Sequence, residues 1–157
     1  ILTLNRFLPF FTFIIIFQFC NISMSQKDQV IVENSVSFFE DEQNKNLIRF
    51  KIKVTNQSRN PIPDLGVENR SKFIKFYFNG KENYPLNLYN GLEKIDGPKT
   101  IPSGSSQEFQ WHESLVYYLD RNVFLHEDEF TVQWEYRKIK SKILQVNVRN
   151  RTVTTLE

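Results

Sequence analysis

The stretch Glu129-Phe130-Thr131-Val132-Gln133-Trp134-Glu135-Tyr136-Arg137 decides the fold class, because apolar and polar side chains alternate along it. A period of two is typical of a half-buried β-strand, in which successive side chains point to opposite faces. The residues expected on the core face are Phe130, Val132, Trp134 and Tyr136. Ser141 to Arg149 shows the same alternation. The short connection through Lys138 to Lys140 predicts that the two strands form an antiparallel hairpin.

Strand signals recur along the rest of the chain. Further strands are predicted at Val30 to Phe39, Leu47 to Val54, Phe73 to Phe78, Tyr84 to Tyr89 and Gln107 to Trp111. The pair Asn79-Gly80 predicts a tight hairpin turn, because both residues tolerate positive φ. Glu113 to Leu125 fits either one short helix or an irregular crossover. The largest side chains expected in the core are Phe50, Phe76, Trp134 and Tyr136.

Three parts of this pattern resemble secreted immunoglobulin-like or fibronectin-III-like domains. They are Ile48 to Ser58, Ile101 to Ser105, and the hairpin from Phe130 to Val148. The resemblance implies an all-β fold, namely a single antiparallel immunoglobulin-like β-sandwich of about seven strands, and it implies no particular activity. The chain departs from antibody-type domains because residues 26–157 contain no cysteine pair.

The first 25 residues predict a secretory signal peptide. Arg6 precedes the apolar block Phe7 to Cys20, and the small-x-small sequence Ser23-Met24-Ser25 follows. A block of this length is shorter than the roughly 20 residues that span a bilayer as a helix. The alternatives are an uncleaved membrane anchor and lipidation at Cys20. We therefore divide the chain into a signal peptide, 1–25, and one β-sandwich domain, 26–157, that is secreted, periplasmic or held at the cell surface.

Removal of residues 1–25 changes the composition of the chain. It takes away six of the 15 Phe, the single Cys and Arg6, and it leaves 19 basic against 18 acidic residues. Without cysteine, no disulfide can form, so an ordinary hydrophobic core must hold the domain together. The near balance of charge argues against general binding to nucleic acid or to an anionic membrane. The N-x-[ST] sequons stand at Asn21, Asn56, Asn69 and Asn150.

The sequence predicts no catalytic residue, metal ligand or cofactor. His112 and His126 have carboxylates near them in sequence, but their spacing does not indicate that they meet. Ser103, Ser105 and Ser106 lie in a Gly-containing turn without a G-x-S-x-G elbow. No phosphate-binding Gly-rich motif is present.

Binding through loops at one end of the sandwich is the favoured function. The long loop Thr55 to Ser71 and the hairpin tip Arg137 to Lys142 are expected to lie at the same end. Together they supply the candidate partner-binding residues Arg59, Pro61, Pro63, Arg70, Arg137, Lys138, Lys140 and Lys142. Such a basic cluster fits another protein or an anionic glycan at the cell surface. For the lysines themselves the preferred interpretation is that they keep an exposed hairpin soluble and its edge unpaired.

Other functions compete with an exported, non-enzymatic binding or structural module. A proteinase inhibitor could present the proline-stiffened loop Asn60-Pro61-Ile62-Pro63-Asp64 to a protease cleft. An enzyme of unknown type is the third hypothesis.

The aromatic residues Phe73 and Tyr77 and the pair Tyr117-Tyr118 are predicted to face outward, where a loop of the same chain or a partner would cover them.

Overall fold

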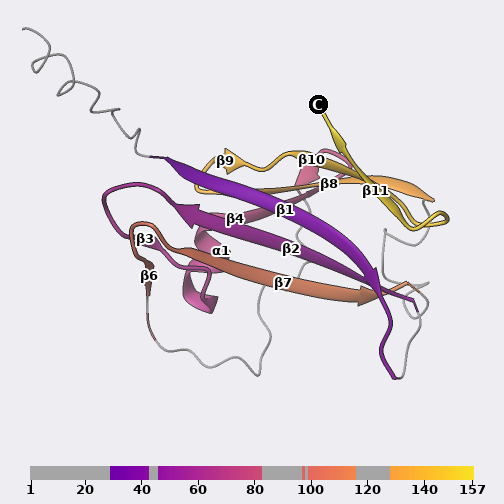
Figure 1. Cartoon of the computed structure of the whole chain (residues 1–157), viewed down its shortest axis with the longest axis horizontal. Coiled ribbons are helices and arrows are strands. Elements are labelled where there is room, and N and C mark those ends of the chain that lie inside the picture. Colours follow the sequence, from indigo (N-terminus) through magenta and orange to yellow (C-terminus); the bar gives the residue numbers. More distant parts are fainter. Residues whose placement is uncertain (1–28, 43–45, 83–96, 98, 116–127) are drawn as a thin grey trace, which may run out of the picture.

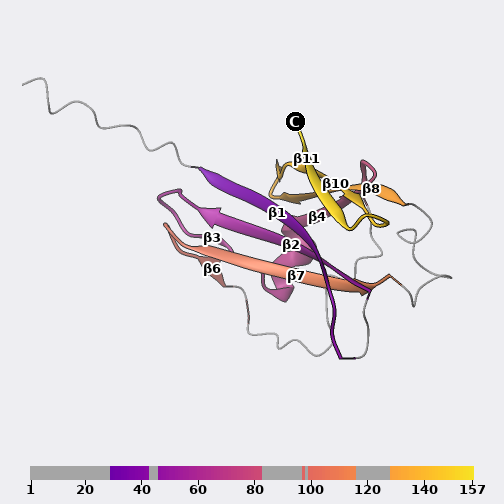
Figure 2. The same cartoon turned by 45° about the vertical axis from the view of Figure 1, so that its right-hand side comes forward.

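A computed structural model describes residues 29–42, 46–82, 97, 99–115 and 128–157. Two antiparallel sheets pack face to face, as the two views in Figures 1 and 2 show. The first sheet has the order β1-β2-β7. Its strands are β1 (Val30–Phe39), β2 (Leu47–Asn56) and β7 (Ser106–Ser114).

The second sheet has the order β11-β10-β8-β4-β5, and β9 pairs with β8 beside that path. Its strands are β4 (Ile74–Phe78), β5 (Lys81–Glu82), β8 (Glu129–Tyr136), β9 (Ile139–Lys140), β10 (Ile143–Asn147) and β11 (Thr152–Leu156). A small ladder joins β3 (Ile62–Pro63) to β6 (Thr100–Ile101), and one short helix, α1 (Val67–Phe73), precedes β4.

The core lies between the two sheets and is built by the alternation that the sequence shows. The four predicted core residues are all buried: Phe50 and Trp134 and Tyr136 at 0 % exposure, and Phe76 at 2 %. Phe50 stacks on Trp111, with ring centroids 5.0 Å apart, and meets Phe76 edge-on at 5.6 Å. Phe76 in turn meets Trp134 at 4.8 Å. Aromatic contacts therefore cross from one sheet to the other.

The predicted all-β, antiparallel, sandwich-like fold is confirmed. Seven strands have five residues or more within the described part of the chain: β1, β2, β4, β7, β8, β10 and β11. The Asn79-Gly80 turn is also confirmed, with φ of 48° and 73°, and it joins β4 to β5. The predicted signal peptide, the return strand Tyr84 to Tyr89 and most of the ambiguous segment 113–125 lie outside the described residues.

Two expectations were wrong. The segment Thr55 to Ser71, expected to be one loop, contains β3 and most of α1, and Phe73 ends this helix instead of beginning a strand. The helix forms because Asp64, which is buried, accepts hydrogen bonds from the Gly66 backbone at 3.1 Å and the Asn69 amide at 2.7 Å. Strand β11 was missed because only Val153 in it is partly buried, so the apolar alternation is weak.

Asn56 organises the end of the sandwich where β2 stops. Its side chain is fully buried, and its Nδ2 donates to the backbone oxygens of Asn60 and Ile101, both at 2.9 Å. Its Oδ1 accepts from the Ser58 backbone at 3.0 Å and from the Ser58 hydroxyl at 2.6 Å. One amide thus supplies partners for the backbone of two separate loops, which buried polar groups require.

Asn56→Ala should lower the free energy of unfolding by about 2–4 kcal/mol, because the substitution leaves the buried Ile101 oxygen and two part-buried backbone groups without partners. Asn150→Ala, in an exposed turn, is the matched control and should change stability by less than about 0.5 kcal/mol. Urea denaturation followed by tryptophan fluorescence measures both changes. Equal effects of the two substitutions would contradict the role given to Asn56.

Candidate functional site

The turn between β8 and β9 has an unusual backbone for its sequence. Arg137 and Lys138 both have positive φ, 49° and 69°, which is the geometry of a type I′ hairpin turn. Asn79-Gly80 makes the same turn with residues suited to it. A residue with a Cβ is disfavoured in this region by about 1–2 kcal/mol, so two long cationic side chains occupy the turn at an energetic cost.

The strands below this turn hold it firmly. Arg137 N donates to Phe73 O at 2.9 Å, and Ser141 N donates to Trp134 O at 2.8 Å. Ser141 is buried, and its hydroxyl accepts from the Trp134 backbone at 3.0 Å. The amide of Gln133 donates to Ser141 O at 2.7 Å. The turn is thus tied directly to the backbone around the buried Trp134.

Four basic side chains project from this hairpin, which we call the basic tip: Arg137, Lys138, Lys140 and Lys142. All four residues are exposed. Lys140 lies with its Nζ 4.5 Å from the ring centroid of Tyr77. None of the four forms an ion pair with a carboxylate in the part of the chain that the structure describes. The tip therefore presents concentrated positive charge to solvent.

The other four predicted residues are placed differently. Arg59 and Pro61 are exposed in the loop after β2, which lies at the same end of the sandwich as the β8–β9 turn (Figure 1). Pro63 joins the two regions, because its carbonyl accepts a short hydrogen bond from the Tyr136 hydroxyl, next to Arg137. Arg70 is only 4 % exposed and stacks over Phe109 at 4.1 Å. Arg70 therefore does not contribute to an exposed basic cluster.

The segment Asn60 to Asp64, considered as an inhibitor loop, is largely turned inward. Ile62 is 4 % exposed and belongs to the core, and Asp64 is 7 % exposed and holds the start of α1. Only Asn60 and Pro61 of this segment are classed as exposed. A loop that docks in a protease cleft needs several accessible consecutive side chains, and this one offers two.

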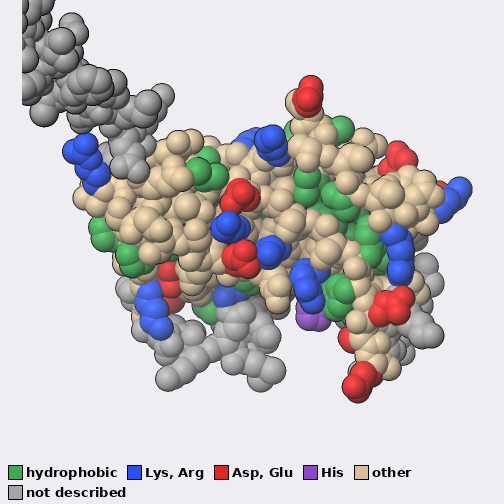
Figure 3. All heavy atoms as spheres, in the orientation of Figure 1, with side chains coloured by type: hydrophobic (Ala, Val, Ile, Leu, Met, Phe, Trp, Pro, Cys, Tyr) green, Lys and Arg blue, Asp and Glu red, His purple; other side chains and the backbone are tan. Residues whose placement is uncertain are grey.

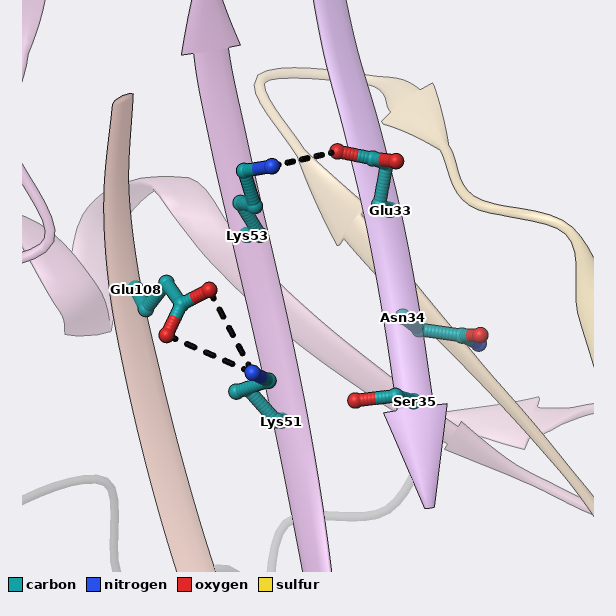
Figure 4. A pocket seen from close by; sticks show the side chains of 6 residues that line it. All are labelled: Glu33, Asn34, Ser35, Lys51, Lys53 and Glu108. Atoms are coloured by element: carbon teal, nitrogen blue, oxygen red, sulfur yellow. Dashed lines mark hydrogen bonds and ion pairs between the residues drawn. The ribbon is translucent and has the colours of Figure 1, made fainter. Parts of the chain in front are cut away.

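A shallow hollow on the outer face of the first sheet was not predicted. It encloses about 230 Å³ and is lined by Glu33, Asn34, Ser35, Lys51, Lys53 and Glu108. Figure 4 shows two ion pairs across it, Lys51–Glu108 and Lys53–Glu33, each at 3.3 Å. Red and blue side chains accordingly alternate over this face in Figure 3. Charges that already neutralise each other make the hollow a poor site for an ionic ligand.

The outer face of the second sheet carries a second satisfied cluster. The Tyr77 hydroxyl donates to Glu135 at 2.8 Å, and this hydrogen bond is the main reason why the pKa of Tyr77 is raised. Lys75 pairs with Glu82 at 2.9 Å. Tyr77 is thus covered by polar side chains of its own sheet and by Lys140. The prediction that Phe73 faces outward was wrong, because Phe73 ends α1 and packs against the core.

The remaining candidates give no further site. His112 is exposed on β7, edge-on to Phe39 at 5.9 Å, and His126, Tyr117 and Tyr118 lie outside the described residues. Among the residues that the structure describes, no three His, Cys, Asp or Glu side chains gather as metal ligands would. No helix in the same residues is long and apolar enough to cross a membrane.

Comparison with known proteins adds no family. Neither models of known protein families nor the curated proteins gave a significant match to this chain.

Replacing Arg137-Lys138 by Asn-Gly should raise the free energy of unfolding by about 1 kcal/mol, because Asn and Gly adopt the required positive φ at lower cost. Gly80→Lys is the reverse change in the matched turn and should lower stability by about 1 kcal/mol. Thermal unfolding of both variants beside the parent checks the pair. If the Asn-Gly variant is no more stable than the parent protein, the energetic cost assigned to Arg137 and Lys138 is wrong.

The buried phenol of Tyr136 should make the folded protein lose stability in alkali. Burial raises the pKa of this phenol above its ordinary value of 10.0. Because the folded state holds the proton more tightly, the stabilisation is complete below pH 10 and is lost as pH rises through the folded-state pKa. Tyr136→Phe should be less stable at neutral pH by about 1 kcal/mol, since Pro63 O loses its donor, and should lose less stability between pH 9 and 11. Denaturation at each pH, with Tyr77→Phe for comparison, measures this.

Proposed function

We propose that this chain is an exported, non-enzymatic binding module of the immunoglobulin-like or fibronectin-III-like class. The support is the strand order. In immunoglobulin domains the first, second, fourth and fifth strands share one sheet, and the third, sixth and seventh share the other. When β1, β2, β4, β7, β8 and β10 are taken as all of these strands except the fourth, the orders β1-β2-β7 and β10-β8-β4 agree with this arrangement, and no strand of the described residues takes the place of the fourth. Strand β11 is then an addition beyond the last strand.

We further propose that the ligand is an anionic glycan and that the basic tip binds it. The observation that carries this proposal is the positive φ at both Arg137 and Lys138. A strained backbone of this kind lowers stability, so it persists only where the surrounding structure holds it in place. Such strain concentrates at functional positions. A hairpin that needed only to turn and stay soluble could use Asn-Gly, as the β4–β5 hairpin does.

The geometry of the tip suits a chain of separated negative charges. Four cations within six consecutive residues are exposed, and the hairpin that carries them is anchored at its base by Ser141. A fixed array reduces the side-chain and loop ordering that binding would otherwise require. The whole chain has a net charge of only +2, so attraction would be local to the tip instead of general.

The double substitution K138E/K140E should abolish salt-sensitive binding to an anionic polysaccharide such as polygalacturonate or heparin. The physical reason is that two attractive charges become repulsive at the tip, while neutral dextran should not bind either protein. K81E/R149E is the control, since it makes the same change in net charge at exposed residues away from the tip and should bind like the parent, even though it also breaks the Arg149–Asp128 ion pair.

Titration by surface plasmon resonance at 50 and 300 mM salt measures these affinities. Equal losses in the two double variants would show a general charge effect and would contradict a specific site. Absence of any polysaccharide binding by the parent protein would reject the glycan as ligand. Circular dichroism of each variant verifies that the fold is retained.

A further inference from the structure

The three sequons within residues 26–157 differ in what surrounds their asparagine side chains. Asn56, Asn69 and Asn150 each open an N-x-[ST] sequence, the acceptor motif for N-linked glycans. Attachment of a glycan replaces one of the two hydrogens on Nδ2 and needs space for a bulky sugar beside that nitrogen. The burial and the hydrogen bonds of each amide therefore decide which sequons can carry a glycan in the folded protein.

The amides of Asn56 and Asn69 are both buried and already used. Asn56 is 0 % exposed, and its Nδ2 donates to two backbone oxygens, each at 2.9 Å. Asn69 is 6 % exposed, and its Nδ2 donates to Asp64 Oδ1 at 2.7 Å and to a backbone oxygen at 3.3 Å. In both residues a glycan would take the place of a hydrogen that a buried acceptor requires.

Asn150 is placed in the opposite way. It lies in the turn between β10 and β11, and both Asn150 and Thr152, which completes its sequon, are exposed. The backbone N–H of Asn150 donates to Asn147 Oδ1 at 2.8 Å, so the turn holds its main chain. The Asn150 side chain makes no hydrogen bond to another residue of the described part of the chain. Its Nδ2 is therefore open to solvent.

We propose that Asn150 carries an N-linked glycan, and that Asn56 and Asn69 stay unmodified in the folded protein. The proposal rests on the export that the proposed function assumes, because such glycans belong to secreted proteins. In the reaction, Nδ2 of Asn150 bonds to C1 of the first sugar of a lipid-diphosphate-linked oligosaccharide. The bond from that carbon to the diphosphate oxygen breaks, the lipid diphosphate leaves with its electron pair, and Nδ2 releases one proton.

Folding then selects among the sequons. A transferase that meets the chain before it folds finds all three asparagines accessible. A glycan on Asn56 would leave a buried backbone oxygen without its donor, and a glycan on Asn69 would break the bond to the buried Asp64 that holds the start of α1. A glycan on Asn150 breaks no hydrogen bond of its side chain to the described residues. Molecules that fold and leave the cell should therefore be modified at Asn150 alone.

Secretion of the full chain from insect cells tests the acceptor site. We expect intact-mass spectrometry to find the polypeptide with a single glycan, and peptide mapping after enzymatic glycan removal to place the resulting deamidation at Asn150. Thr152→Ala destroys the sequon and should abolish the modification. Thr152→Ser is the matched control, since it keeps the hydroxyl that the sequon requires and should retain the glycan.

Two forms of the leader separate this proposal from the assumption of export. One form keeps residues 1–25, and the other has a signal peptide of the host in their place. Secretion of the second form alone would contradict export by the chain's own leader, while the mass of that form still decides the acceptor site. Secreted protein without a glycan at Asn150, or folded protein with one at Asn56 or Asn69, overturns the proposal. So does protein from the natural source in which Asn150 is unmodified.

Discussion

The contact between Phe50 of the first sheet and Phe76 of the second is the interaction on which the rest of the structure depends. Phe50 also stacks on Trp111, and Phe76 meets Trp134, so four rings form a continuous aromatic layer between the sheets. Residues 26–157 contain no cysteine, so non-covalent contacts must hold the sheets together. Complete burial of such a side chain contributes about 2–3 kcal/mol, and the ring contacts add to it.

This aromatic layer also positions the loops at one end of the sandwich, because hydrogen bonds from buried residues connect the layer to those loops. The Trp134 backbone N–H donates to the Ser141 hydroxyl oxygen, and the Tyr136 hydroxyl donates to Pro63 O. Asn56 ties the loop after β2 to Ile101. Each of these hydrogen bonds is made by a residue of the core or next to it, so their geometry follows the packing of the sheets. The basic tip is consequently held in place by the same contacts that stabilise the fold.

Periodicity in the sequence predicted the strands that have one face on the core. In β2 and β8 every second residue is buried, and these strands and their core residues agree with the structure. Periodicity could not predict α1. Its seven residues make fewer than two helical turns, which is too short for a repeating apolar stripe to be recognised. It could not predict β11 either, because an edge strand with little buried surface has no need for alternation. A run of β-branched residues was the available signal.

For the candidate site, prediction from the sequence is limited in a different way. A sequence shows where charged residues are, but it does not show which of them pair with opposite charges in the folded protein. Lys51 and Lys53 face Glu108 and Glu33 only because of the register of three strands, of which β7 is distant in sequence from β1 and β2. Arg70 is next to a run of exposed residues, yet it is buried over Phe109 because α1 turns it inward.

The basic tip keeps its charge for the converse reason. Glu135, the cross-strand neighbour of Lys140, hydrogen-bonds to Tyr77, and no carboxylate of the described residues forms an ion pair with the tip. Where a cation can act on a partner is thus decided by strand register and not by composition.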